Sequence, residues 1–152
     1  VPIAVSGSAD GTVRLWDVRA RHSVRLLGTH ADVVGTVTIG AVRGKTVALS
    51  GSEDGEVRVW DLTLATPSGT TLSRIRNAVK TVVVGTVNGR TVAVSGNDDN
   101  TIRIWDLFTG NPYGDGLTGP ETAAEALAIG TAGGRTTVVS GHWDGAIWAW
   151  CL

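Results

Sequence analysis

Serine, histidine and aspartate are the residue types in this chain that could form a nucleophilic triad. In such a triad, histidine takes the proton of a serine hydroxyl while aspartate orients the imidazole. The candidate serines, however, recur at one position in each of four similar segments, at Ser6, Ser50, Ser95 and Ser140. A catalytic residue is normally singular, and the sequence contains no Gly-x-Ser-x-Gly elbow. The pattern therefore favours a scaffold role for these serines, and we expect no catalytic residue.

Two further motifs imitate ligand-binding loops. The stretch "GAVRGKT" ends like a phosphate-binding loop, but only three residues separate its glycines and no helix is expected after it. The stretch "NDDN" (97–100) offers oxygen ligands without the spacing of a twelve-residue calcium loop. The three histidines share no ligand spacing, and Cys151 is the single cysteine. We therefore interpret both motifs as turns and expect no metal and no cofactor.

Composition narrows the classes of partner. The 152 residues carry a formal net charge of −1, with acidic and basic residues interspersed, so neither nucleic acid nor a membrane surface is an expected partner. No apolar run approaches the roughly 18 residues that span a bilayer, and no signal peptide is apparent. Arginine greatly outnumbers lysine, which suggests a GC-rich, bacterial genome. We expect a bacterial, cytoplasmic protein.

The chain is one unit repeated. Four segments align without gaps and begin 44, 45 and 45 residues apart: "SGSADGTVRLWDV", "SGSEDGEVRVWDL", "SGNDDNTIRIWDL" and "SGHWDGAIWAWCL". Residues 46–51 and 56–62 are rich in β-branched side chains and flank an Asp-Gly turn, which predicts a hairpin. A second hairpin is predicted upstream, at Arg43-Gly44, Asn88-Gly89 and Gly133-Gly134.

Each period therefore predicts four short antiparallel strands, which we call a, b, c and d from the inside outward. Strand a is expected at 33–40 in one period, and strand d at 24–27, 70–72 and, weakly, 114–117. Four strands in about 45 residues are typical of a β-propeller blade. The fold class is all-β, with about 3.5 blades and 14 strands. Blade limits are predicted at 1–27 (b, c, d), 28–72, 73–117 and 118–152 (a, b, c).

The repeated Ser-Gly-x-x-Asp-Gly/Asn…Trp-Asp pattern resembles the WD-repeat (WD40) family of β-propellers along nearly the whole chain. That resemblance implies a hydrogen-bonded tetrad of His, Ser, Asp and Trp in each blade. One set is complete: His30, Ser50, Asp54 and Trp60. Ile75 and Pro120 stand at the His position of the next two sets, so we expect weaker blades there, with water in place of imidazole. The remaining members are Ser6, Asp10, Trp16, Ser95, Asp99, Trp105, Ser140, Asp144 and Trp150.

Variation among the copies indicates where a partner binds. The framework repeats, whereas the residues preceding the turn aspartate differ from copy to copy. On relatives of this kind, the b–c turns and the loops entering strand a form the binding face. We therefore predict a partner-binding face of Asp32, Val33, Glu53, Arg76, Asp98, Glu121 and Trp143. Trp143 either anchors a partner or packs on a neighbouring loop. An arginine recurs two residues before each strand c tryptophan, at Arg14, Arg58 and Arg103. These side chains either stack from blade to blade into a ring of charge or lie in solvent near the outer edge.

The resemblance implies a non-enzymatic scaffold for protein–protein interaction that binds a protein or peptide. We expect the regulatory or sensor part of a longer protein, cut from a larger propeller. The alternative assembly is self-association, in which copies complete each other's rings. The alternative function is a propeller hydrolase or lyase with a central-channel site, for which Lys80 and Glu125 are the charges of the innermost strands.

Overall fold

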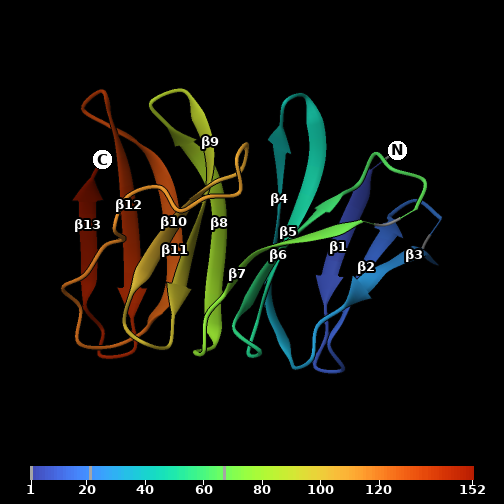
Figure 1. Cartoon of the computed structure of the whole chain (residues 1–152), viewed down its shortest axis with the longest axis horizontal. Coiled ribbons are helices and arrows are strands. Elements are labelled where there is room, and N and C mark those ends of the chain that lie inside the picture. The colour runs from blue at the N-terminus through green and yellow to red at the C-terminus, as the bar shows by residue number, and fades with distance from the viewer. Residues whose placement is uncertain (1, 21, 67) are drawn as a thin grey trace.

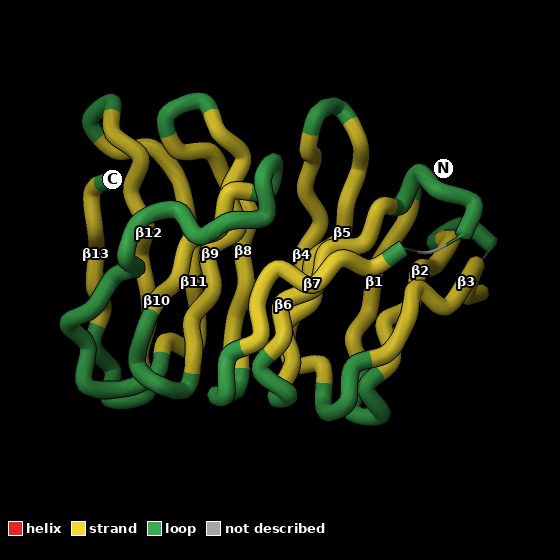
Figure 2. Tube along the Cα trace, viewed as in Figure 1, coloured by secondary structure: helices red, strands yellow, loops and turns green. Residues whose placement is uncertain are grey.

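The computed structural model describes residues 2–20, 22–66 and 68–152, and the regular elements of these residues are all strands (Figure 1, Figure 2). Val1, Arg21 and Pro67, which fall inside the first two predicted blades, lie outside the described residues. The strands are β1 (Ile3–Gly7), β2 (Thr12–Asp17), β3 (His22–Thr29), β4 (Val34–Val42), β5 (Lys45–Ser52), β6 (Glu56–Asp61), β7 (Gly69–Arg74), β8 (Val79–Val87), β9 (Arg90–Asn97), β10 (Ile102–Asp106), β11 (Ala124–Ala132), β12 (Arg135–His142) and β13 (Ile147–Cys151). No helix in the described part of the chain has the length and apolar character that a membrane span requires.

The strands form four antiparallel sheets, β1-β2-β3, β4-β5-β6-β7, β8-β9-β10 and β11-β12-β13. The sheets stand side by side as blades, from β1–β3 at one end to β11–β13 at the other (Figure 1). The a strands β4, β8 and β11 are neighbours from blade to blade. This arrangement confirms the predicted all-β propeller. Strands β3 and β7 run two residues beyond the predicted blade limits at 27 and 72.

The prediction of fourteen strands is wrong by one, because residues 114–117 do not form a strand. In place of a regular ladder, residues 112–117 pair with β10 through two isolated bridges, Ile102 to Leu117 and Trp105 to Pro112. Gly114 and Gly116 have φ values of 76° and 84°, which a β-strand does not accommodate. Residues 112–117 still cover the outer edge of β10, since Tyr113 and Leu117 donate backbone hydrogen bonds to it.

The predicted hairpins depend on residues that tolerate positive φ. Each a–b connection has two such residues in succession, at Arg43-Gly44, Asn88-Gly89 and Gly133-Gly134. That pair of angles is the type I′ turn, whose twist matches that of the flanking strands. The stretch "GAVRGKT" therefore runs from β4 through one of these hairpins into β5, which confirms the turn interpretation over a phosphate-binding loop.

Gly55, in a b–c turn, has a second requirement besides its φ of 81°. A Cβ placed there would lie 1.7 Å from the carbonyl oxygen of Ile75, whose backbone N–H donates to the Gly55 carbonyl. Asn100 takes the equivalent position in the next blade with a φ of 63°, and its side chain donates to the carbonyl of Glu121. The turn therefore fixes the entry to the following blade.

Three apolar clusters lie between successive blades, and each joins the outer strands of one blade to the a, b and c strands of the next, with the segment at Tyr113 and Leu117 in place of a d strand in the third blade. The clusters centre on Val13 and Trp60, on Val57 and Trp105, and on Ile102 and Val138. A β-sheet with two apolar faces needs cover on both, so each internal blade is buried by its two neighbours.

Replacing Gly55 with Ala should lower the free energy of unfolding by about 3 kcal/mol, since it adds both left-handed strain and a backbone clash. Gly44→Ala is the matched control, because Gly44 has a similar φ of 74° but open space around it. The control should cost only about 1 kcal/mol. Urea unfolding of both variants measures the difference, and equal losses would contradict the proposed clash.

Candidate functional site

The second blade brings together four side chains: His30 directly after β3, Ser50 on β5, Asp54 in the b–c turn and Trp60 on β6. The Nε2 atom of His30 lies 2.7 Å from Ser50 Oγ, and Trp60 Nε1 donates to the same oxygen at 2.9 Å. The Nδ1 atom of His30 lies 3.1 Å from Asp54 Oδ2. Because an indole N–H only donates and a carboxylate only accepts, the hydroxyl of Ser50 donates to His30, and His30 donates to Asp54.

Burial sets the charge state of this network. Burial lowers the pKa of His30 below its ordinary 6.5, and the nearby Asp54 carboxylate offsets this only in part. Burial would raise the pKa of Asp54, but hydrogen bonds from the backbone N–H groups of Glu56 and Ala31, together with His30, hold that pKa below its ordinary value. The network therefore contains a neutral imidazole and an ionised carboxylate near pH 7.

Ser50, His30 and Asp54 thus have the order of contacts of a catalytic triad, but not its access. Ser50 is fully buried, and its oxygen accepts the indole N–H of Trp60. A triad serine must instead present its oxygen to a substrate carbonyl. The arrangement supports a structural network.

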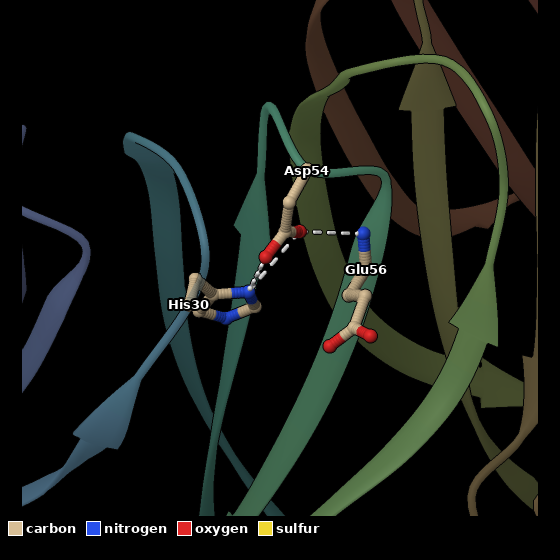
Figure 3. Close-up of side chains that lie close together, drawn as sticks. All are labelled: His30, Asp54 and Glu56. Atoms are coloured by element: carbon tan, nitrogen blue, oxygen red, sulfur yellow. Dashed lines mark hydrogen bonds and ion pairs between the residues drawn. The ribbon is translucent and has the colours of Figure 1, made fainter.

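His30, Asp54 and Glu56 also place potential metal-ligand atoms within 4.8 Å of one another. Figure 3 shows that the backbone nitrogen of Glu56, not its carboxylate, meets Asp54, and this hydrogen bond measures 2.8 Å. The Glu56 carboxylate pairs with Arg58 at 2.6 Å and with Arg74 at 2.9 Å. Since protein partners already occupy both imidazole nitrogens and the carboxylates, the cluster fits a hydrogen-bond network better than a metal site.

The first blade contains the Ser, Asp and Trp members. Trp16 Nε1 donates to Ser6 Oγ at 2.8 Å. Asp10 accepts hydrogen bonds from the side chain and backbone of Thr12, at 2.7 and 2.9 Å. These bonds lower the pKa of Asp10 to about 2, so the aspartate fixes the turn.

The third blade has a looser network. The distance from Trp105 Nε1 to Ser95 Oγ is 3.5 Å. Asp99 instead binds Thr101 and Arg103, and the Arg103 contact measures 2.8 Å. Burial would raise the pKa of Asp99, but these hydrogen bonds hold it below its ordinary value. With Ile75 at the histidine position, no imidazole joins this set.

The last blade obtains an imidazole from a position that the sequence analysis did not identify. His142, two residues after Ser140 on β12, places its Nε2 atom 2.6 Å from Ser140 Oγ. Its Nδ1 atom donates to the carbonyl of Thr122 at 2.8 Å. Imidazole therefore stands where water was expected. Alternation along a strand could have revealed this, because residues i and i+2 share a face. Asp144 instead caps its own turn through the N–H of Ala146.

The predicted partner-binding residues lie on what we call the turn face, the lower end of the blades in Figure 1, where the b–c turns meet the loops entering strand a. The N–H of Glu53 donates to the carbonyl of Val33, and that of Asp98 to the carbonyl of Ala78, both at 2.9 Å. Val33 is half-buried and the other predicted residues are exposed: Asp32, Glu53, Arg76, Asp98, Glu121 and Trp143. Trp143 is 83% exposed, so it does not pack on a neighbouring loop.

Two of the recurrent arginines have polar partners in the structure. Arg58 binds Glu56 in its own blade and the carbonyl of Thr29 in the preceding blade, and Arg103 binds Asp99 in its own blade. These contacts give no support to a stacked ring of charge.

The opposite end of the blades has a feature that sequence reasoning missed. A groove of about 450 Å³ lies between the second and third blades, with Val47 and Leu72 among its lining residues. At its edge the guanidinium of Arg43 lies 3.1 Å above the ring of the exposed Phe108. Phe108 is unique in the chain, so no repeated pattern could indicate it.

His30→Ala should lower the free energy of unfolding by about 2 kcal/mol or more, because Ser50 and Asp54 lose a buried partner. His142→Ala should cost about 1–2 kcal/mol for the same reason at Ser140. His22→Ala is the matched control, since His22 is exposed, and it should leave the melting temperature unchanged. Thermal unfolding followed by circular dichroism measures all three. Equal melting temperatures for the wild type and His30→Ala would refute the tetrad's structural role.

Stability should fall as the pH falls from 7 to 5. The unfolded chain takes up a proton on His30 near pH 6.5, whereas the folded chain, with its lowered pKa, does so only at lower pH. Asp54 adds a further loss below about pH 3.8, since its folded pKa is also lowered. Urea titrations at pH 7.5, 6.5 and 5.5 should give a shallower pH dependence for His30→Ala than for the wild type. An equal dependence would exclude His30 as its source.

Comparison with known proteins agrees with the fold and the repeat. Residues 1–136 match the model of the family described as Nucleolar protein 10-like, N-terminal domain, a β-propeller family. No curated protein matches the sequence. The crystal structure of the computationally designed Ika4 protein is similar, with a TM-score of 0.81 and 28% identity over 99% of this chain and 85% of that chain. The family match covers most of the chain, and the chain therefore belongs to the Nucleolar protein 10-like family of N-terminal β-propeller domains.

Proposed function

We propose that this propeller domain is a non-enzymatic scaffold that binds a protein or peptide on its turn face. The observation that carries the proposal is the 83% exposure of Trp143 on a b–c turn. Large aromatic side chains are favoured anchors of protein interfaces, since they bury much area with few rotatable bonds. The indoles of Trp60 and Trp105, in contrast, are buried in the framework.

The charge of the turn face indicates what kind of partner fits. Asp32, Glu53, Asp98 and Glu121 are exposed acids, and Arg76 is the exposed base among the predicted residues. The carboxylate of Asp98 lies 3.9 Å from the ammonium of Lys80, which is a long separation for an ion pair, and both side chains are partly exposed. A partner that presents lysine or arginine beside an apolar group complements this surface, and the acids would raise its association rate at low salt.

The enzyme alternative gains no support from the described residues. The Ser50, His30 and Asp54 network is closed to substrate, and Lys80 lies within ion-pair range of Asp98. Glu125 is exposed on β11, with no observed partner that would make it a general acid or base. The scaffold is therefore the function that we put forward.

Three finer expectations rest on the sequence alone and stay predictions: a bacterial origin, a cytoplasmic location, and a place in the regulatory or sensor part of a longer protein. The word nucleolar in the family description refers to the protein for which the family is named. Fluorescence microscopy of the tagged chain in its native cells tests the location.

Affinity capture with the immobilised chain tests the proposal. The triple variant Glu53→Lys, Asp98→Lys and Trp143→Ala should lose the captured partner, because it removes the anchor and reverses the charge. The matched control changes the opposite end of the blades by Arg43→Glu, Phe108→Ala and Arg135→Glu, and it should retain the partner. Quantitative mass spectrometry of the captured proteins gives the readout, and an increase in salt should weaken the wild-type interaction.

Three outcomes would overturn the proposal: specific capture that survives the turn-face variant, loss of capture in the control alone, and no specific capture by the wild type. Circular dichroism of each variant shows whether the blades remain folded, so that a loss of binding is not confused with unfolding.

A further inference from the structure

The two ends of the blades differ in charge. The turn face presents four exposed acids, whereas the opposite end, the upper end in Figure 1, is formed by the a–b hairpins. We call it the hairpin end. The hairpins at 41–46, 86–91 and 131–136 contain no acid, and each carries an exposed cation directly after its turn glycine: Lys45, Arg90 and Arg135. The hairpin end therefore suits a different partner from the turn face.

Two of these cations are neutralised within their own blades. Lys45 pairs with Asp61, and Arg90 pairs with Asp106, each at 2.9 Å. Hydrogen bonds from the Thr63 hydroxyl and the Lys45 ammonium hold the pKa of Asp61 at about 2. The Arg90 guanidinium likewise lowers the pKa of Asp106. Both acids are therefore ionised near pH 7 and balance the cations beside them.

Arg43, between these two pairs in the sequence and exposed at a hairpin tip, has no such balance. In the part of the chain that the structure describes, no carboxylate lies within ion-pair distance of its guanidinium. That group lies instead 3.1 Å above the ring of Phe108, which is 61% exposed. A guanidinium stacked on a ring keeps its N–H donors in its own plane, where a carboxylate can accept two of them. The stacked pair thus presents an uncompensated cation beside an apolar ring.

Two hollows meet at this stacked pair. The groove of about 450 Å³ has Val47, Leu64 and Leu72 among its apolar lining residues. A second hollow of about 490 Å³ shares Arg43 and Phe108 with the groove and continues along the third blade. Both hollows are bounded by the second and third blades, which each have a neighbour on either side (Figure 1). A ligand that occupies both hollows must pass the guanidinium.

The groove wall at Leu64 is fixed by an arginine of the first blade. Arg25 donates to the carbonyl of Leu62 at 2.9 Å and to that of Ala65 at 3.3 Å, and also to the carbonyl of Leu64. Residues 62–65 are therefore held in place before any ligand arrives. A preformed wall lowers the ordering cost of binding.

We propose that the hairpin end binds an acidic peptide segment of a partner protein, with one carboxylate on Arg43 and a neighbouring large apolar side chain in the groove. The carboxylate supplies the charge that Arg43 lacks, and burial of an apolar side chain against Val47 and Leu72 supplies the hydrophobic contribution. A nucleic acid would offer the charge but no aliphatic side chain for these walls. This surface is separate from the turn face, so neither proposal depends on the other.

A phage-displayed library of random peptides, selected on the immobilised chain, tests this inference. Selection runs in parallel on the wild type and on the double variant Arg43→Asn and Phe108→Thr. The replacements are the residues that other blades have at these positions: Asn88, with a φ of 49° beside 52° for Arg43, and Thr63. The backbone N–H of Thr63 donates to Asp61 just as that of Phe108 donates to Asp106. Hairpin and connection should therefore keep their geometry, which circular dichroism and thermal unfolding check.

Peptides enriched on the wild type alone should contain Asp or Glu beside a large apolar residue. A labelled peptide from this set, measured by fluorescence anisotropy, should bind Arg43→Asn about tenfold more weakly, because a charge-assisted pair is lost. Arg135→Glu is the matched control, since it changes an exposed cation of the same end that lines neither hollow. It should change the affinity by less than about twofold, because salt screens distant charges.

Equal enrichment on the wild type and the double variant would overturn the inference, as would wild-type-specific peptides that contain no acid. Displacement of the labelled peptide by single-stranded oligothymidylate, with no loss of affinity when its apolar residue becomes Ser, would assign a bare polyanion site and would also overturn it. The turn-face triple variant should retain these peptides. A failure of this inference is thereby distinguished from a failure of the scaffold proposal.

Discussion

The packing of one blade's tryptophan against the apolar strands of the preceding blade is the interaction on which the rest of the structure depends. A four-stranded sheet with two apolar faces cannot cover both by itself, and burial of apolar area is the main favourable term in folding. Trp60 and Trp105 supply the largest side chains of two of the junctions. The position of these indoles sets the orientation of each blade relative to its neighbour, and that orientation places the turns and loops at the two ends.

The polar tetrad complements this apolar contact. An indole that is buried for packing needs a partner for its N–H, and Ser50 provides it through the network to His30 and Asp54. Asp54 also accepts hydrogen bonds from the backbone of Ala31 and Glu56, so the network ties the b–c turn to the loop that enters strand a. In the last blade, His142 supplies an imidazole to Ser140 from a different strand position. In the described residues, an imidazole therefore contacts the strand b serine in the second and last blades, from two different positions in the sequence.

The features of the structure that repeat from blade to blade could be predicted from the sequence. The 44- and 45-residue spacing, the Asp-Gly and Asn-Gly turns and the β-branched strands predicted the blades, because each property recurs in copies that check one another. The predicted strand at 114–117 was wrong because Gly114 and Gly116 take positive φ in a loop with no regular counterpart. The tetrad set of His30 could be located by resemblance, whereas His142 could not, since the resemblance attaches the imidazole to one position. Phe108 lies in the connection that follows strand c, and both the length and the sequence of this connection differ from copy to copy. The features that differ among the four copies depend on tertiary contacts. A comparison of the copies with one another does not reveal such contacts.

Val57 and Trp105, which belong to one apolar cluster between the second and third blades, provide the most direct test of the blade-packing account. A double-mutant cycle with Val57→Ala and Trp105→Phe, measured by urea unfolding, isolates the coupling between these two side chains. If their packing holds the second and third blades together, the coupling energy should be about 1 kcal/mol. Additive losses, to within about 0.3 kcal/mol, would show that the two residues act independently and would contradict the account.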